Sequence, residues 1–270
     1  MRNRLHALCP YFAMFPEDFA EEHVRQFTSE GDYVYDPFSG RGTTLLQSLL
    51  MRRQAVATDI NPVAYCLSAA KAHVPSLEHV IREVNRLDQR YRDHDKSQLE
   101  EQRHSLPPFF GRAFHYSTLE QLLFLRGTLN WRRNHVHRFI AALTLGILHG
   151  EMGRSSRYLS NQMPRTISPK PAYSVRYWRA HNLWPKKKDA FHKLRAECRF
   201  RLSGELPSIR GSVVLTDVRQ AAKKLRPLTG TIAAVITSPP YFDVTSSEED
   251  QWLRLWFLGN EPHPTYGKIS

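Results

Sequence analysis

A strand, a glycine-containing loop, a helix and a second strand that ends in an acid follow one another near the start of the chain. This order constrains the fold more than any other feature. The β-rich run 33–35 leads into the loop that begins at Asp36 and reads DPFSGRG. Apolar residues recur on one helical face over 43–51, and the apolar strand 55–58 ends at Asp59. The sequence therefore predicts a βαβ unit and a parallel sheet.

Two further apolar runs extend this sheet towards the other end of the chain. Residues 213–216 precede Asp217, and residues 232–236 lead into the segment TSPPY at 237–241. Uninterrupted apolar strands are typical of parallel sheets that are covered on both faces. We therefore predict an α/β fold with a Rossmann-like core.

Between these two parts lies a long stretch of predicted helices. It begins with a highly charged helical run and includes one stretch, 154–181, whose prolines, basic residues and aromatic residues break the periodicity. We expect that stretch to be an extended binding loop. The predicted helices cover 76–103, 119–133, 137–149 and 186–201, and an amphipathic helix is expected at 248–258 near the end.

The glycine loop predicts a ligand that contains ribose. Gly40 and Gly42 lack side chains, so the backbone can come close to a ligand where the strand turns into the helix. Asp59 follows Gly42 by 17 residues, at the end of the next strand, which suits hydrogen bonding to two ribose hydroxyls. The loop lacks the Gly-Lys-Ser/Thr ending of a phosphate-binding P-loop. A purely structural turn is the alternative interpretation of this loop.

The segment Ser238-Pro239-Pro240-Tyr241 has the groups needed to hold a nucleobase amino group. Such a nitrogen is a poor nucleophile because its lone pair is delocalised into the ring. The Ser238 hydroxyl and the Pro239 carbonyl can accept hydrogen bonds from its N–H groups. Two prolines stiffen the loop and remove competing donors, and Tyr241 offers a surface on which a flipped base can stack. As an isolated tetrapeptide the segment could also be a proline-rich turn.

The net charge of +12 is unevenly distributed along the chain. Between Phe110 and Arg210 there are 19 Lys and Arg residues against 5 Asp and Glu, whereas the remainder carries 19 basic and 21 acidic residues. Positive charge interleaved with tyrosines and tryptophans indicates a nucleic-acid partner. The residues expected to contact it are Arg154, Arg157, Arg165, Lys170, Arg176, Arg179, Lys186, Lys187 and Lys188.

Other classes of protein find little support in the sequence. The three cysteines are far apart and form no C-x-x-C pair, which favours reduced thiols over a disulfide framework or a zinc site. The histidines form no H-E-x-x-H motif, so no metal site is predicted. No apolar run reaches the roughly 18 residues needed to span a bilayer, and no signal peptide is recognisable. We expect a cytoplasmic, nucleoid-associated protein without a membrane partner.

These motifs together resemble those of S-adenosylmethionine-dependent DNA amino-methyltransferases. The stretch DPFSGRGTT from Asp36 resembles the cofactor motif of that family, and TSPPY at 237–241 resembles its catalytic motif. YFAMFP at 11–16 resembles the upstream motif that closes over the methionine end of the cofactor. The serine-initial catalytic motif is typical of members that methylate cytosine N4. The resemblance covers roughly residues 8–73 and 210–260.

The resemblance implies a role for individual residues of this sequence. Ser238, Pro239, Pro240 and Tyr241 would hold the target amino group, and S-adenosylmethionine would be the cofactor. Asp36, Gly40 and Gly42 would line its methionine and ribose side, Asp59 would bind the ribose hydroxyls, and Asp217 would lie near the adenine. The full set of implied cofactor residues is Phe12, Asp36, Pro37, Phe38, Gly40, Gly42, Thr43, Asp59, Ile60, Asn61 and Asp217.

The order of the motifs implies three parts. Residues 1–75 would form the cofactor half of the core, 76–209 a helical and basic target-recognition insert, and 210–270 the catalytic half. Such enzymes have a seven-stranded sheet, yet only four strands are recognisable here, so the sheet is expected to be incomplete. Double-stranded DNA is the expected substrate. A cognate restriction nuclease, or a chain that completes the sheet, is the expected protein partner.

Two other functions agree with the same motifs. One is an RNA amino-methyltransferase acting on guanine N2 or adenine N6, whose catalytic motif more often begins with Asp or Asn. The other is a truncated nucleic-acid-binding protein that no longer transfers methyl groups. It would bind DNA without turnover. Methylation of a ring carbon would need a nucleophilic cysteine, commonly in a Pro-Cys pair, and Cys9-Pro10 reverses that order.

Overall fold

A computed structural model describes residues 3–11, 15–153, 155–166, 168–239 and 247–264 of the chain. The chain divides into two compact units, each assembled from three separate stretches. The first, which we call the core unit, contains residues 1–77, 131–142 and 199–242. The second, the helical unit, contains 78–130, 143–198 and 243–270. Residues 76–77, 131–142, 199–209 and 243–270 are thus grouped differently from the three consecutive parts expected from the order of the motifs.

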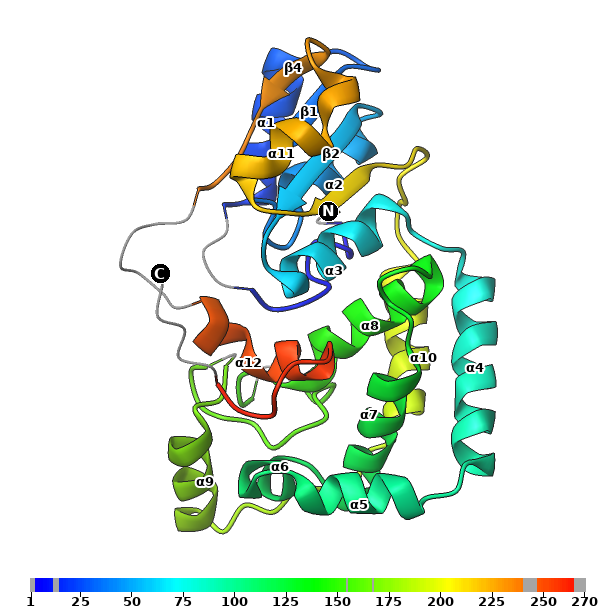
Figure 1. The fold of residues 1–270 in the computed structure, drawn as a ribbon, viewed down its shortest axis with the longest axis vertical. Coiled ribbons are helices and arrows are strands. Elements are labelled where there is room, and N and C mark those ends of the chain that lie inside the picture. Colours follow the sequence, from blue (N-terminus) through cyan, green and yellow to red (C-terminus); the bar gives the residue numbers. More distant parts are fainter. Residues whose placement is uncertain (1–2, 12–14, 154, 167, 240–246, 265–270) are drawn as a thin grey trace. The chain divides into compact units, whose positions relative to one another are not determined.

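The core unit is built on a four-stranded, all-parallel sheet in the order β3-β2-β1-β4 (Figure 1). Its strands are β1 (Tyr33–Asp36), β2 (Gln54–Asp59), β3 (Ser212–Leu215) and β4 (Ile232–Val235). All four lie within a residue or two of the predicted runs, which confirms the α/β prediction. The chain adds β2 and β3 on one side of β1 and then crosses to place β4 on the other side.

Helices accompany these strands in alternation. They are α1 (Glu17–Phe27), α2 (Thr43–Leu50), α3 (Pro62–Ala72), α11 (Val218–Lys224) and the short 3-10 helix η1 (Arg226–Leu228). The predicted start of α3 is confirmed, because Pro62 occupies the first turn and the Asn61 side chain accepts a hydrogen bond from the Val63 N–H. The strand–helix alternation is that of a doubly wound parallel sheet.

Apolar side chains of α1 and α2 pack against one face of the sheet. Leu45 and Leu49 of α2 join Ala55 and Ala57 of β2 in one cluster, and Val24 of α1 joins Val34 and Ile236 in another. The alternate residues of β4 are more exposed, and Val235 retains 59% of its accessible surface. Burial of this kind contributes roughly 25 cal/mol per Å² of apolar surface, so the packing of α1 and α2 stabilises this face of the sheet.

The helical unit contains seven helices and part of an eighth within the described residues. Three of them supply an aromatic core formed by Phe109, Phe110, Trp178, Trp252 and Trp256, all at most 3% exposed. The helices are α4 (Leu77–Asp93), α5 (Ser97–Ser105), α6 (Pro108–Ala113), α7 (Tyr116–Thr128), α9 (Pro171–Ala180), α10 (Ala190–Arg201), α12 (Ser247–Phe257) and the second half of α8 (His135–Leu148).

Two expectations about this region were wrong in detail. The helix predicted over 76–103 is divided into α4 and α5, because Asp95 accepts hydrogen bonds from the N–H and the hydroxyl of Ser97 and starts a new helix. The loop predicted over 154–181 contains α9. Pro171 lies in the first turn of that helix, where a missing N–H costs nothing, so the proline begins the helix and does not break it.

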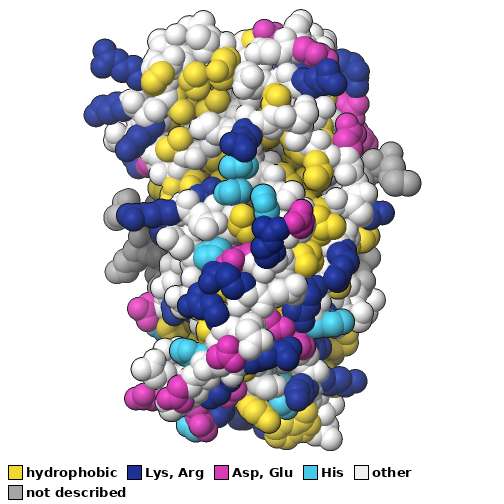
Figure 2. Space-filling model, turned by 90° about the vertical axis from the view of Figure 1, so that its right-hand side faces the viewer, with side chains coloured by type: hydrophobic (Ala, Val, Ile, Leu, Met, Phe, Trp, Pro, Cys, Tyr) yellow, Lys and Arg dark blue, Asp and Glu magenta, His cyan; other side chains and the backbone are white. Residues whose placement is uncertain are grey.

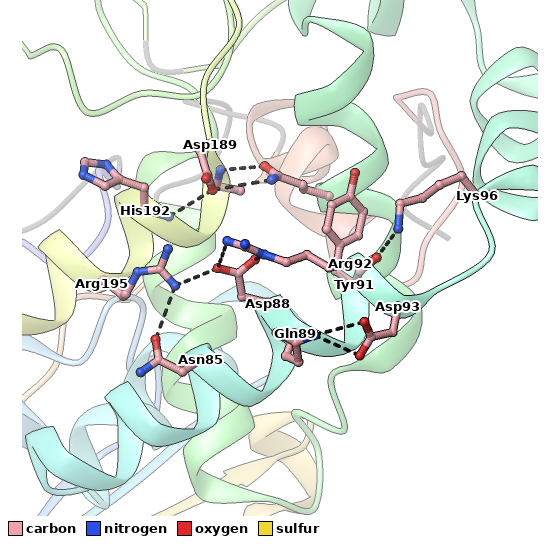
Figure 3. Close-up of polar contacts among 12 residues, drawn as sticks. Asn85, Asp88, Gln89, Tyr91, Arg92, Asp93, Lys96, Asp189, His192 and Arg195 are labelled. Carbon is pink, nitrogen blue, oxygen red and sulfur yellow. Dashed lines mark hydrogen bonds and ion pairs between the residues drawn. The ribbon is translucent and has the colours of Figure 1, made fainter.

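An ion-pair cluster links α4 to α10 (Figure 3). The Asp88 carboxylate pairs with Arg92 of its own helix at 3.1 Å and with Arg195 of α10 at 2.9 Å. Because Asp88 has two cationic partners, its pKa is lowered even though partial burial opposes the shift. The cluster fixes the packing of α4 against α10 within the helical unit.

α12 is an integral part of the helical unit. The Trp252 indole N–H donates to the Pro169 carbonyl at 2.7 Å, and Arg254 Nε donates to the Leu145 carbonyl at 3.3 Å. Arg126 Nε donates to the Trp256 carbonyl at 2.8 Å. The predicted amphipathic helix is therefore confirmed, and its buried face carries polar contacts as well as apolar ones.

Candidate functional site

The carboxyl ends of the four strands form a row of polar residues along one edge of the sheet. In the order of the strands these residues are Asp217 after β3, Asp59 at the end of β2, Asp36 at the end of β1 and Ser238 after β4. Ligands of open parallel sheets bind outside the carboxyl ends, where the strand order reverses. Here the order reverses between β1 and β4, which makes Asp36 and Ser238 the centre of the candidate site.

Asp36 connects the first motif to the last. Thr237 Oγ1 donates a hydrogen bond of 2.6 Å to Asp36 Oδ1, and the Phe38 N–H donates to the same oxygen at 3.2 Å. Asp36 is 3% exposed, and this burial raises its pKa to about 6 although both hydrogen bonds oppose the shift. Thr237 was part of the quoted motif, but only the contact with Asp36 identifies it as a site residue.

Asp59 holds the glycine loop to the end of β2. The Gly40 N–H donates to Asp59 Oδ2 and the Asn61 N–H donates to Asp59 Oδ1, both at 2.9 Å. A carboxylate oxygen can accept more than one hydrogen bond, so both oxygens retain acceptor capacity for a ligand. Burial raises the pKa of Asp59, and the backbone N–H groups act against that increase. The neighbouring Ile60 is 68% exposed, an unusual position for a large apolar side chain.

The two glycines of the loop have different reasons for lacking a side chain. Both have positive φ angles, 49° at Gly40 and 76° at Gly42, which favours glycine at each position. A Cβ on Gly42 would lie 2.8 Å from Ser68 Oγ and 3.1 Å from the Ser68 Cα. Gly42 therefore permits close packing of the loop on α3, whereas a Cβ on Gly40 would meet Tyr11 and the Phe38 carbonyl at ordinary contact distances of 3.5 and 4.0 Å.

Two residues of α3 that the sequence prediction missed donate hydrogen bonds to the backbone of the glycine loop. Ser68 Oγ donates to the Gly40 carbonyl at 3.0 Å, and Lys71 Nζ donates to the Arg41 carbonyl at 2.6 Å. Lys71 is 1% exposed, and burial lowers its pKa well below the ordinary value. A lysine within the otherwise small and apolar run SAAKA is the sequence signal that could have identified it.

Asp217 lies beside Asp59 but has another local role. Its side chain caps α11 by accepting the Arg219 N–H at 2.8 Å, and it pairs with the Arg219 guanidinium at 2.6 Å. These contacts with Arg219 lower the pKa of Asp217 to about 2. The Thr216 N–H donates to the Asp59 carbonyl at 2.9 Å, which brings the ends of β2 and β3 together.

The remaining predicted residues of the core unit lie around the same edge. Tyr11, Phe15, Asp36, Phe38, Ser39, Gly40, Arg41, Thr43 and Ser238 line one hollow, so residues of the three resembling motifs meet there. Pro37 is buried, and its carbonyl accepts a hydrogen bond from Thr58. Pro239 is exposed. Phe12, Pro240 and Tyr241 lie outside the described residues.

The predicted nucleic-acid contacts that the structure describes are in the helical unit and form two groups. Arg165, Lys170, Arg176, Arg179, Lys186 and Lys187 are exposed. Arg157 instead pairs with Glu197 at 3.5 Å, and Lys188 Nζ donates to the carbonyls of Tyr158 and Ser160 at 2.5 and 3.1 Å. These two side chains are thus engaged within the unit. Arg154 lies outside the described residues.

Within the described part of the chain, no group of three or more potential metal-ligating side chains is found. Cys9, Cys66 and Cys198 are all buried and unpaired to one another. Among the described residues no helix combines the length and the apolar character needed to cross a bilayer.

Comparisons with known proteins agree with this site. Residues 2–71 match the family model described as DNA methylase, of the N6/N4 methyltransferase group. The chain is 44% identical over 54 residues to the orphan methyltransferase M.BamHII of Bacillus amyloliquefaciens, which is 20% of each protein. It is 22% identical over 283 residues to the Type II methyltransferase M.BsoBI of Geobacillus stearothermophilus, covering 94% of this chain and 53% of that protein.

A third relative is the Type II methyltransferase M.MjaII of Methanocaldococcus jannaschii, 31% identical over 67 residues, or 25% of this chain and 13% of that protein. The matches thus span from about an eighth to about half of the length of these relatives. The family match covers β1, the glycine loop, β2 and most of α3. Each of these similarities is to methyltransferases, and the family match and the two matches above 30% identity cover about a quarter of this chain or less.

Proposed function

We propose that this chain transfers a methyl group from S-adenosylmethionine to an exocyclic amino group in double-stranded DNA, with cytosine N4 as the target. The observation that carries the proposal is the hydrogen bond of 2.6 Å between Thr237 Oγ1 and Asp36 Oδ1. It joins the loop that resembles a cofactor motif to the loop that resembles a catalytic motif. It does so where the strand order reverses, which is where parallel sheets bind their ligands.

The donor and acceptor groups at the strand ends fit the cofactor. Asp59 keeps acceptor capacity for ribose hydroxyls, and the exposed Ile60 beside it offers an apolar surface for an adenine ring. The Asp36 carboxylate suits the cationic end of the ligand. Bound S-adenosylmethionine supplies an activated methyl group on a sulfonium, so the protein contributes mainly positioning.

Ser238 and Pro239 are the proposed contacts of the target base. The Ser238 hydroxyl and the Pro239 carbonyl accept hydrogen bonds from the amino group and draw its nitrogen towards tetrahedral geometry. The hydrogen bond of Thr237 to the buried Asp36 orients the peptide that precedes them. In this proposal Pro240 stiffens the loop, and Tyr241 stacks on a base that has left the duplex. The serine at position 238 is the reason to prefer cytosine N4 over adenine N6.

The exposed basic residues of the helical unit are the proposed contacts of the DNA backbone. Arg165, Lys170, Lys186 and Lys187 would hold phosphates, which positions the duplex without selecting a sequence, and the exposed Arg176 and Arg179 of α9 are further proposed DNA contacts. The Type II names of two of the relatives suggest a role in restriction and modification, and a cognate nuclease is then the functional counterpart. The proposed location is the cytoplasm, at the nucleoid.

Transfer of a radiolabelled methyl group from S-adenosylmethionine to mixed-sequence duplex DNA tests the proposal, followed by analysis of the nucleosides. Labelled N4-methylcytosine is the expected product, and N6-methyladenine would correct the target base. A matched reaction with structured RNA tests the RNA enzyme. Transfer to RNA alone would overturn the DNA proposal. If no methyl group is transferred and calorimetry detects no cofactor binding, while DNA binding is retained, the non-catalytic binding protein is favoured.

A further inference from the structure

α9 is anchored to the helical unit through one of its sides. Trp178 is fully buried, its indole N–H donates to the Gln162 carbonyl at 2.9 Å, and its ring lies 5.6 Å from that of Phe109 in α6. Ser174, one turn earlier on the same side, is also fully buried. The helix is therefore held in a fixed rotation about its axis, which determines the residues of its outer side.

The outer side of α9 combines charge, aromatic rings and small residues. Ala172, Tyr173, Arg176, Arg179 and Ala180 are all exposed, and Tyr173 retains 56% of its surface. At 100° per residue these five positions fall on one arc, opposite Ser174 and Trp178. Around the arc the order is Arg179, Ala172, Arg176, Ala180 and Tyr173, so Arg176 lies at the centre and the alanine on each side of it allows close approach of a partner. We call these five residues the α9 face.

The two arginines of this face have no ion-pair partner among the described residues. From Met152 to Lys188 the sequence contains nine Lys and Arg residues and no Asp or Glu. Among the described residues, neither Arg176 nor Arg179 forms an ion pair, and the same is true of Lys170 at the start of the helix. Unneutralised cations next to exposed aromatic rings favour a polyanionic partner.

We propose that the α9 face reads base edges in the DNA major groove and thereby sets the sequence specificity of the methyl transfer. The inference rests on the proposed function, because it names the element by which the same enzyme selects its site. The major groove is about 12 Å wide and admits one α-helix. Arginine pairs with guanine through two hydrogen bonds, and alanine contacts the thymine methyl group.

The positions of these residues separate recognition of base edges from binding of the phosphate backbone. Lys170, Lys186 and Lys187 lie outside α9, and lysine binds phosphate as a point charge, so these residues hold the backbone. Arg176 and Tyr173 lie on the α9 face itself and contact base edges. Substitution at the two kinds of position therefore has different consequences. Removing a group that binds a base edge changes which sequence is preferred, whereas removing a group that binds phosphate weakens binding to every sequence.

The experiment is a selection from randomised duplexes with the full chain in the absence of cofactor, for wild type, Arg176→Gln, Tyr173→Ala and Lys170→Gln. Arg82→Gln in α4 is the matched control, because Arg82 is exposed but pairs with Glu78. Wild type is expected to enrich a defined sequence. Arg176→Gln should weaken binding to that sequence about tenfold and alter the preference at one base pair. Lys170→Gln should weaken binding to all DNA sequences by the same factor, and Arg82→Gln should bind as wild type does.

Thermal unfolding of each variant excludes loss of the fold as the cause. The inference would be overturned if Arg176→Gln and Tyr173→Ala both retained the fold, the affinity and the sequence preference of wild type. Methyl transfer by wild type would in that case still support the proposed function. Enrichment of no sequence by wild type, or preference for structured RNA, would also overturn it. A changed preference in Arg176→Gln without any methyl transfer by wild type would support the reading role and contradict the proposed function.

Discussion

The arginines of α4 and the basic residues of the segment 152–188 belong to the same unit but have different partners. α4 carries four arginines and four acids, and its pairs join Arg82 to Glu78, Arg86 to Glu83 and Arg92 to Asp88. The segment 152–188 carries nine basic residues and no acid. Figure 2, which views the molecule from the side that carries α4, shows Lys and Arg side chains interspersed with Asp and Glu in its lower part. Charge on α4 is thus neutralised locally.

This difference shows that the number of basic residues does not by itself identify a nucleic-acid surface. A cation that already has a carboxylate partner gains less from a phosphate, because the first partner must be given up. The same distinction applies inside the segment 152–188. Arg157 and Lys188 are engaged with Glu197 and with backbone carbonyls, whereas Arg176 and Arg179 on the α9 face have no acidic partner among the described residues.

The largest expected effect comes from removing the unpaired charges. Replacing Lys170, Arg176 and Arg179 together by alanine should weaken DNA binding on the order of 100-fold at moderate salt. The magnitude of the slope of log K against log salt should fall by about 0.9 for every phosphate that is no longer neutralised. The corresponding α4 variant, with Arg82, Arg86 and Arg92 changed to alanine, should retain the slope. Fluorescence anisotropy across a salt series measures both. Equal decreases in affinity in the two variants would remove the distinction between paired and unpaired arginines.

A second prediction concerns the row of acids at the strand ends, where Asp217 is paired and Asp36 is buried. Because the folded pKa of Asp36 is raised from 3.8 to about 6, its ionisation lowers stability as the pH rises through about 6. A cationic ligand offsets that loss. Affinity for S-adenosylmethionine should therefore increase about tenfold between about pH 5 and about pH 7, as the ionised fraction of Asp36 rises.

Calorimetry over this pH range checks the second prediction. Asp36→Asn should bind more weakly and without the pH dependence. Asp217→Asn should keep the dependence, because the Arg219 guanidinium and N–H already hold the pKa of Asp217 at about 2, far below the range tested. A pH dependence that persists in Asp36→Asn would show that another group titrates.

A third prediction separates two neighbouring lysines. Lys188 donates to the Tyr158 and Ser160 carbonyls, whereas Lys187 is exposed. Lys188→Met should lower the free energy of unfolding by about 1–2 kcal/mol, because it leaves two carbonyls without their donor. Lys187→Met should change it by less than about 0.5 kcal/mol. Urea unfolding at neutral pH measures both, and similar stabilities would contradict a structural role for Lys188.

The lowered pKa of Lys188 also predicts a pH dependence of stability that distinguishes Lys188→Met from Lys187→Met. Burial, with Lys193 and Lys186 nearby, lowers its pKa from 10.5 to about 8. Between these two values the unfolded chain binds more protons than the folded one, so this group makes stability rise with pH. The rise should be present in wild type and in Lys187→Met and absent in Lys188→Met.

The smallest effect is expected in α4. Arg82→Ala removes an exposed i,i+4 pair with Glu78 and should lower the free energy of unfolding by about 0.3–0.5 kcal/mol, an effect that salt diminishes. Comparison of urea unfolding at low and high salt detects it. A loss that salt does not reduce would mean that Arg82 contributes through packing and not through its charge.

The sequence by itself determined the parts of this protein that depend on local pattern. The four strands, the start of α3 at Asn61-Pro62 and the positive-φ glycines of the loop follow from residues adjacent in the chain, because backbone sterics and short-range periodicity control them. The motifs likewise put Asp36, Asp59 and Asp217 at the ends of predicted strands. The parallel pairing then brings those acids to one edge.

Only the tertiary structure decided which charges are available and how the motifs are held. The exclusion of Arg157 and Lys188 from the exposed set depends on Glu197, Tyr158 and Ser160, contacts that the basic composition does not reveal. Lys71 supports the glycine loop across 30 residues of sequence, and Thr237 reaches Asp36 across 201. Such contacts form only after distant segments pack, because burial and hydrogen-bond geometry depend on the whole fold.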